Sequence, residues 1–191
     1  VQMDALAVWQ ARRLGVSNFY LLSDHANLPP VVSRVLADRD SQVNAVLVPG
    51  QLACISGFED YEPIAETMRR PIVVTGFEPT DILEGILKAV NLLEYGKAAV
   101  ENQYKRAANR QGNLEVRALI SEVFEVCQRE WRGLGVVPAG GYALKPEFSA
   151  FDAHQVFAPL GACDIEGTGC ISSEIWLGLK SPLQCPLFGK T

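Results

Sequence analysis

Two stretches that are apolar almost throughout constrain the fold of this chain more than any other feature. They are VNAVLV (43–48), which a Pro-Gly pair ends, and PIVVTG (71–76). Strands that are apolar along their whole length are typical of a parallel sheet covered on both faces. Helical spacing of apolar residues follows each stretch, within 51–69 and over 79–93, so strand and helix alternate. The pattern predicts an α/β fold, a doubly wound, mostly parallel sheet with helices on both faces.

The remaining stretches give weaker signals, which extend the same fold. They predict a helix over 1–14 ended by a glycine, a strand over 18–24, a helix over 29–36, a strand or extended segment over 97–106, helical periodicity over 113–129, a loop, strand and turn over 130–144, and a short helix over 146–157. Composition shifts to Gly, Ser and Pro near residue 160. We therefore expect an α/β domain over 1–160 and a small irregular, cysteine-containing segment over 161–191.

Composition excludes several classes of protein. The net charge of −5, from 17 basic and 22 acidic residues, argues against nucleic acid as a partner. No apolar run approaches the roughly 18 residues of a membrane span. Five cysteines, an odd number, do not suggest a secreted disulfide framework, so we expect the reducing cytoplasm. The abrupt ends, beginning at Val1, suggest a fragment of a longer chain.

Chemically capable residues follow the predicted strands. His25 follows 18–24, Gln51 follows 43–48, and Phe77 and Glu78 follow 71–76. Ligands of open α/β sheets collect at the carboxyl ends of the strands, so these residues are predicted to wall a cleft. The alternatives are a histidine bonded to a backbone carbonyl, a carboxylate that caps the next helix, and a packed aromatic ring.

Two further segments are candidate linings of this cleft or of a partner surface. Residues 101–106, ENQYKR, contain Glu101, Asn102, Gln103 and Tyr104, although a solvated helix face has the same composition. Residues 130–135, EWRGLG, place Trp131 beside Arg132, a pattern that also fits a tight turn pinned by an indole. Walker, dinucleotide and nucleophile-elbow motifs are absent from the sequence.

Three cysteines occur in the last segment. Cys163, Cys170 and Cys185 suggest an iron–sulfur or zinc site that lacks a fourth ligand, and the alternative is three unrelated buried thiols. Cys54 and Cys127 fall in predicted helices and are expected to be small core residues.

Taken together, these blocks resemble the C-terminal half of the HypD family, the maturation factors of [NiFe] hydrogenases. The resemblance is carried by LLSDHANLPP (21–30), VPGQLACISG (48–57), TGFEPTDILEGI (75–86), VENQYKRAANRQGN (100–113), EWRGLG (130–135), FSAFDAHQVF (148–157) and GCISSEIWLGLKSPLQCPLFGK (169–190). It implies a cytoplasmic scaffold, rather than a stand-alone enzyme, that holds an iron atom while cyanide and carbon monoxide ligands are assembled on it. The partners implied are a HypC-like small chaperone and a HypE-like cyanide donor, and a [4Fe–4S] cluster is implied in the C-terminal region.

The resemblance also assigns residues and shows departures. His25, Phe77 and Glu78 lie in the blocks that face the family's cleft, and Cys170 and Cys185 match cysteines of its cluster region. Gln51 stands where the family usually has histidine, and Ser172-Ser173 stand where it commonly has Cys-Gly. The family's iron-coordinating cysteine belongs to an N-terminal half not represented here.

Two alternatives to the scaffold remain open. One is a divergent interaction module that keeps the fold without metal or redox activity, which the three departures favour. The other is an unrelated small-molecule enzyme that uses His25 and Glu78 as an acid–base pair.

Overall fold

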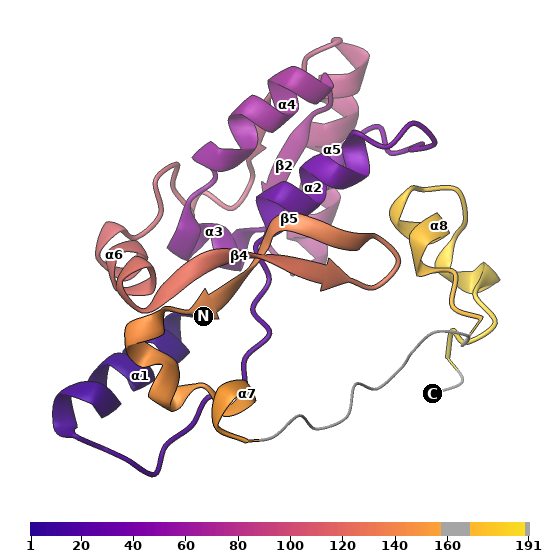
Figure 1. Cartoon of the computed structure of the whole chain (residues 1–191). Helices are drawn as coiled ribbons and strands as arrows, with labels where there is room; N and C mark the ends of the chain where they lie inside the picture. Colours follow the sequence, from indigo (N-terminus) through magenta and orange to yellow (C-terminus); the bar gives the residue numbers. More distant parts are fainter. Residues whose placement is uncertain (158–168, 190–191) are drawn as a thin grey trace. The chain divides into compact units, whose positions relative to one another are not determined.

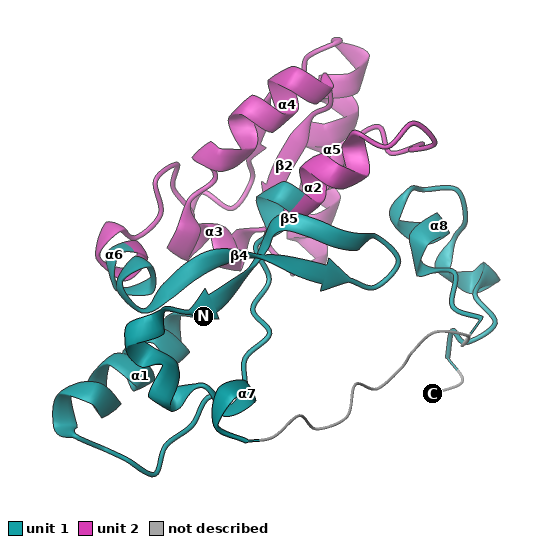
Figure 2. Ribbon diagram, in the orientation of Figure 1, with its two compact units in different colours: residues 1–30, 118–191 teal, residues 31–117 magenta. Residues whose placement is uncertain are grey.

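The protein divides into two compact units (Figure 2). The structure is a computed structural model that describes residues 1–157 and 169–189. Unit 1 comprises Val1–Pro30 and Ala118–Thr191, and unit 2 comprises Val31–Arg117. The predicted domain boundary near residue 160 and Cys163 lie outside the described residues.

Figure 1 shows the elements along the chain. The helices are α1 (Gln2–Leu14), α2 (Leu28–Leu36), α3 (Gly50–Ser56), α4 (Glu62–Met68), α5 (Pro79–Glu94), α6 (Leu114–Val123), α7 (Ala153–Val156) and α8 (Ser172–Trp176), with 3₁₀ turns η1 (Glu59–Tyr61), η2 (Pro146–Phe151) and η3 (Pro182–Gln184). The strands are β1 (Val46–Pro49), β2 (Ile72–Thr75), β3 (Val100–Asn102), β4 (Phe124–Trp131) and β5 (Gly135–Leu144). None of the helices in the described ranges is long and apolar enough to cross a bilayer.

Unit 2 is built on a parallel sheet with the strand order β1-β2-β3. The central strand, β2, is buried along its whole length, with Ile72, Val73 and Val74 all fully inaccessible to solvent. Ile72 and Val74 pack with Ala53 of α3 and Ala65 of α4, whereas Val73 packs with residues of α5. Because successive side chains of a strand point to opposite faces, the helices cover both sides of the sheet. The predicted α/β class is confirmed.

Unit 1 combines α1 with the antiparallel hairpin β4–β5. Its core is formed by one face of α1, the end of α6, the hairpin and η2, through Ala5, Val8, Ala11, Val123, Phe124, Leu144, Phe148 and Phe151. Gly15 ends α1 in the left-handed conformation, with φ 67°, as the sequence predicts.

Two predicted elements are wrong. Residues 18–24 form no strand, and only Leu21 makes an isolated bridge, to Asp152. This segment is apolar because Phe19 and Leu21 pack on the core of unit 1. Helix α6 ends at Val123, and residues 124–129 belong to β4, because pairing with β5 overrides the local helical periodicity. Cys127 therefore lies in a strand, whereas Cys54 lies in α3 as predicted.

Candidate functional site at the carboxyl ends of the parallel strands

The carboxyl ends of all three parallel strands of unit 2 meet at one edge of the sheet. Pro49 pairs with Thr75, and Val74 pairs with Asn102. The residues that follow the strands, Gly50-Gln51, Gly76-Phe77 and Gln103-Tyr104, therefore lie along the same edge. This is where an open α/β sheet collects ligands.

The ring of Tyr104 lies against two glycines at this edge. A Cβ atom added to Gly50 would lie 2.6 Å from Cδ1 of Tyr104, and one added to Gly76 would lie 2.8 Å from its Cε2. No real Cβ fits at such distances, so both positions require glycine while the ring keeps its place. The two glycines thus form a seat for the Tyr104 ring.

Asp81 and Arg106 fix the other side of the seat. The guanidinium of Arg106 donates to both oxygens of Asp81, at 2.8 and 2.5 Å, and lies 4.3 Å from the centroid of the Tyr104 ring. The side-chain amide of Gln103 donates to Oδ1 of Asp81 at 2.9 Å, and its carbonyl oxygen accepts from the backbone N–H of Gly76 at 3.3 Å. Thr75, which is buried, donates its hydroxyl to the carbonyl of Asp81 at 2.8 Å.

These contacts keep Asp81 ionised. Hydrogen bonds from Arg106 and then Gln103 lower the pKa of Asp81 to about 2. Asp81 is only 4% exposed, and its carboxylate also accepts from the backbone N–H of Glu78. We call Thr75, Asp81, Gln103, Tyr104 and Arg106 the floor of the site, because their polar groups are largely used up in bonds to one another.

Three side chains at the same edge are not used in this way, and we call them the rim: Gln51, Phe77 and Glu78. All are exposed, Phe77 by 64%, and none forms a side-chain hydrogen bond or ion pair within residues 1–157 and 169–189. Glu78 occupies the N-cap position of α5, but its side chain makes no capping hydrogen bond. The rim therefore offers an amide, an aromatic ring and a carboxylate to a ligand or partner.

The rest of residues 101–106 is structural. Glu101 pairs with Lys88 at 2.8 Å, and the side-chain amide of Asn102 donates to the carbonyl of Ala108 at 2.8 Å. The Oδ1 atom of Asn102 is buried without a hydrogen-bond partner. The segment is thus the end of β3 and its packed continuation, not a solvated helix face.

His25 belongs to unit 1. Its Nε2 atom lies 3.0 Å from a carboxylate oxygen of Asp4 without the alignment of a hydrogen bond, and its ring meets that of Phe124 edge-on at 5.5 Å. Burial lowers the pKa of His25 below 6.5. Because Glu78 lies in unit 2, a cleft shared by the two residues stays a prediction.

Trp131 and Arg132 lie at the tip of the β4–β5 hairpin in unit 1. The indole N–H of Trp131 donates to the carbonyl of Gly140 at 3.0 Å, which agrees with a turn pinned by an indole. The Trp131 ring also contacts that of Trp176 edge-on, at 6.4 Å between centroids. Gly133 allows the hairpin tip to approach the start of α8 closely, since a Cβ there would lie only 2.6 Å from the hydroxyl of Ser172.

The described cysteines of the last segment do not form a complete metal site. Hydrogen bonds from Ser172, with the nearby charge of Arg132, lower the pKa of the Cys170 thiol. Cys170 and Cys185 are both partly exposed free thiols. Within the described ranges, no three His, Cys, Asp or Glu residues gather as a metal site would require. A cluster needs ligands beyond these two thiols.

The sequence pattern missed three members of the floor. Asp81 lies in the first turn of α5, where a carboxylate is common because it favours the helix dipole, and Thr75 and Arg106 carried no signal of their own. Arg106 lies 25 positions from Asp81. One signal was present, because ENQYKR begins in the last two residues of β3 and places cations just beyond the end of that strand.

The fold and the strand-end constellation define a class: an α/β protein with a rigid polar floor and a free rim at the carboxyl edge of a parallel sheet. Comparison with known proteins narrows the class. The profile of HypD, described as "Hydrogenase formation hypA family", matches residues 1–191. The chain belongs to the HypD family.

Curated relatives agree with this assignment. The chain is 39% identical over 190 residues to "Hydrogenase maturation factor HypD" of Escherichia coli, covering 98% of this chain and 50% of that protein. It is 36% identical over 191 residues to the factor of the same name from Azotobacter vinelandii, covering 97% and 50%. It is 36% identical over 174 residues to "Putative hydrogenase expression/formation protein MJ0993" of Methanocaldococcus jannaschii, covering 91% and 48%. The chain thus spans about half the length of these relatives.

Proposed function

We propose that the protein acts in hydrogenase maturation, as part of a scaffold that holds an iron centre while cyanide and carbon monoxide ligands are assembled on it. The family match over residues 1–191 carries this proposal. The rim supports it, since a site for an iron–cyanide cargo needs a few polar groups placed by a rigid frame. The frame is the floor, whose side chains bond one another.

The rim suggests how this part of the scaffold contributes. The amide of Gln51 donates hydrogen bonds of the kind that a cyanide nitrogen accepts, and Phe77 offers an apolar wall. The family resemblance adds the N–H of His25 as a second proposed donor, although His25 belongs to unit 1. The rim contains no cysteine, so the thiolate anchor that low-valent iron favours would come from elsewhere in the complex.

Partners and the cluster follow from the same family membership. We propose a HypC-like small chaperone and a HypE-like cyanide donor as partners. The thiols of Cys170 and Cys185 fit ligands of a [4Fe–4S] cluster by type, but the described residues do not complete its ligand set. If such a cluster is bound, it would supply electron transfer.

The test uses the full-length protein, purified anaerobically with and without the small partner. We expect bound iron and infrared bands of its cyanide and carbonyl ligands. Glu78→Gln and Phe77→Ala should weaken the bands, whereas Glu94→Gln and Tyr95→Ala, exposed changes near the other end of α5, should not. His25→Ala should act like the rim variants, with His154→Ala as its control. Bands that survive all three site variants unchanged would remove this edge from the iron site.

A second candidate function is an interaction module without metal chemistry. Helix α5 favours it, because five large aliphatic side chains on one face are between 42% and 67% exposed: Leu83, Ile86, Leu87, Val90 and Leu93. Such a continuous apolar patch is typical of a protein-binding surface. A stable complex with the HypC-like partner that carries no iron under the conditions above would favour this function over the first.

A further inference from the structure

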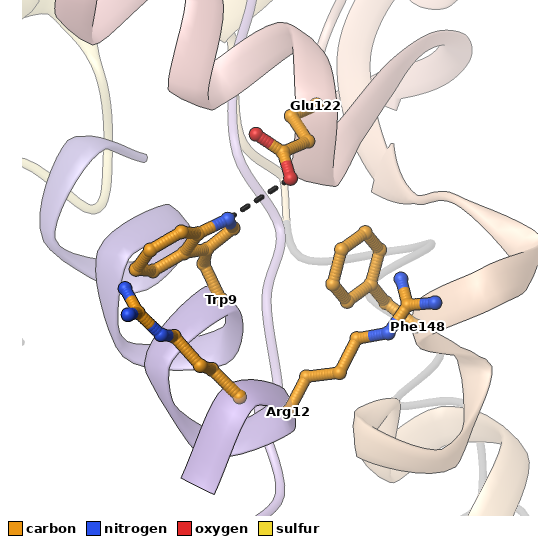
Figure 3. A pocket seen from close by; sticks show the side chains of 5 residues that line it. Trp9, Arg12, Glu122 and Phe148 are labelled. Carbon is orange, nitrogen blue, oxygen red and sulfur yellow. Dashed lines mark hydrogen bonds between the residues drawn. The ribbon is translucent and has the colours of Figure 1, made fainter.

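Unit 1 contains a pocket that neither the family resemblance nor the proposed function uses. It has a volume of about 440 Å³ and is lined by Trp9, Arg12, Arg13, Glu122 and Phe148. Three of these side chains come from α1 at positions i, i+3 and i+4, which share one face of a helix. Figure 3 shows the pocket from close by.

Two aromatic rings form its apolar part. Phe148 of η2 is 1% exposed and belongs to the core of unit 1, so its position is fixed by packing. Trp9 is fixed by a hydrogen bond, since its indole N–H donates to Oε1 of Glu122 at 2.9 Å (Figure 3). Phe148 therefore supports the guanidinium of Arg12 from within the core, and the half-buried ring of Trp9 presents the fixed apolar surface of the pocket.

Two cations accompany these rings. The guanidinium of Arg12 lies 4.7 Å from the centroid of the Phe148 ring, and that of Arg13 lies 5.3 Å from the Trp9 ring. These separations are in the range of cation–π contacts. The rings thus hold both guanidiniums at the pocket without using their N–H donors in hydrogen bonds.

The donors of both arginines are open to a ligand. Among residues 1–157 and 169–189, neither Arg12 nor Arg13 has an ion pair or a side-chain hydrogen bond, unlike Arg34, which pairs with Asp38 at 2.8 Å. Basic residues in the last turn of a helix interact favourably with the helix dipole, which alone would explain why two arginines occur at this end of α1. The dipole does not account for their stacking on two rings around a pocket.

Glu122 limits what the pocket can take. With Arg12 and Arg13 it leaves a net charge of about +1, and one of its oxygens is already engaged by Trp9. A ligand with several negative charges would be repelled by the carboxylate, whereas a single anionic group would still gain from the guanidinium fork.

We propose that this pocket binds a small organic monoanion with a flat apolar body. Its carboxylate would pair with Arg12 and Arg13, and its body would lie against the ring of Trp9. The site is independent of the strand-end rim in unit 2, so its failure would leave the proposed function untouched.

Benzoate is the first probe, because it combines a carboxylate with a flat ring. The ¹⁵N-labelled chain is titrated with benzoate, and the indole N–H resonance of Trp9 is followed after assignment with Trp9→Phe. We expect a saturable shift of that resonance, with the indoles of Trp131 and Trp176 as internal controls. Benzamide, which lacks the charge, and acetate, which lacks the ring, should each bind at least tenfold more weakly.

Two variants give opposite expectations. Arg12→Gln should weaken benzoate binding about tenfold, the effect of losing a charge-assisted hydrogen bond. Glu122→Gln should tighten it severalfold, because its amide oxygen still accepts from Trp9 while the negative charge is gone. Arg34→Gln, in unit 2, should leave binding unchanged.

The outcomes decide the proposal. No saturable shift of Trp9 with benzoate, or equal binding of benzamide, overturns it. Equal binding of acetate would show a general anion site and refute the flat-body requirement. Benzoate binding that Arg12→Gln leaves intact, in a variant with the far-ultraviolet circular dichroism of the parent, would also refute it. Arg12→Lys, which keeps the charge and loses the fork, should fall between parent and Arg12→Gln.

Discussion

The seat of Tyr104 gives the sharpest test of the candidate site. In Gly50→Ala, the new methyl group would lie 2.6 and 2.7 Å from two ring atoms of Tyr104 and 2.9 Å from the carbonyl oxygen of Thr75. Overpacking of this kind costs about 1–3 kcal/mol of unfolding free energy. Replacing glycine also restricts the unfolded chain, which returns about 0.4–1 kcal/mol. We expect a net loss of about 1–2 kcal/mol.

Removing the ring should remove part of this loss. In the Tyr104→Ala background, the two shortest of the three nearest contacts of the methyl group at position 50 are gone, and the contact with the Thr75 carbonyl oxygen at 2.9 Å remains. Gly50→Ala should then cost less, by a coupling energy of about 1 kcal/mol in the double-mutant cycle. The three tryptophans all lie in unit 1, so their fluorescence does not report on unit 2. Amide hydrogen exchange is the assay, read at Gln103, whose N–H donates to the carbonyl of Val74 at 2.8 Å.

A control variant distinguishes the effect of the contact with the Tyr104 ring from the effect of replacing any glycine by alanine. Gly96→Ala meets nothing within 4 Å, although its φ of 61° makes alanine strained there. Its effect should not depend on the residue at position 104. If Gly50→Ala costs the same with and without the Tyr104 ring, the ring does not rest on this glycine and the floor of the site is wrongly described.

Three further predictions concern pH and the hairpin. Because the folded pKa of His25 lies below 6.5, the unfolded chain binds the proton more tightly; unit 1 should lose stability as pH falls through 6.5, and the acid shift of its melting temperature should shrink in His25→Gln. The pKa of Asp81 is about 2 in the folded protein, against the ordinary value of 3.8, so its contribution to stability should be constant above pH 5 and be lost between about pH 4 and 2. Asp81→Asn should be less stable at neutral pH, and amide exchange of unit 2 should no longer show that acid transition. Gly133→Ala should disturb the Trp131–Trp176 ring contact and change tryptophan fluorescence. Gly135→Ala should not, because Gly135 is also left-handed, at φ 69°, but a Cβ there would meet no atom within 4 Å. Identical spectra for the two variants would contradict the close contact between Gly133 and Ser172.

The sequence predicts the sheet well where burial alone decides the structure. Residues 71–76 are apolar because β2 is covered on both faces. Residues 18–24 look similar, but their apolar side chains serve the core of unit 1 without a neighbouring strand. Apolar composition indicates that a segment is buried but not whether it pairs with a neighbouring strand. The local sequence therefore does not distinguish the two segments, and only their long-range contacts do.

The same distinction applies to the site. Gln51, Phe77 and Gln103 are predictable because each follows a strand, and strand ends of a parallel sheet converge. The pairing of Asp81 with Arg106 is not, because it depends on the turn after β3 bringing a cation across to α5. An ion pair between distant positions leaves no periodic trace in one sequence.

Floor and rim therefore have different consequences for mutation. The floor residues bond one another, so replacing them should change stability first and function only through the positions of their neighbours. The rim residues Gln51, Phe77 and Glu78 have no such bonds within the described chain, so replacing them should cost little stability. A change in the rim that abolishes iron loading while leaving amide exchange at Gln103 unchanged would be a direct effect on the cargo or partner. If rim variants instead lose stability and keep iron loading, the rim residues are structural and their assignment to the binding site is wrong.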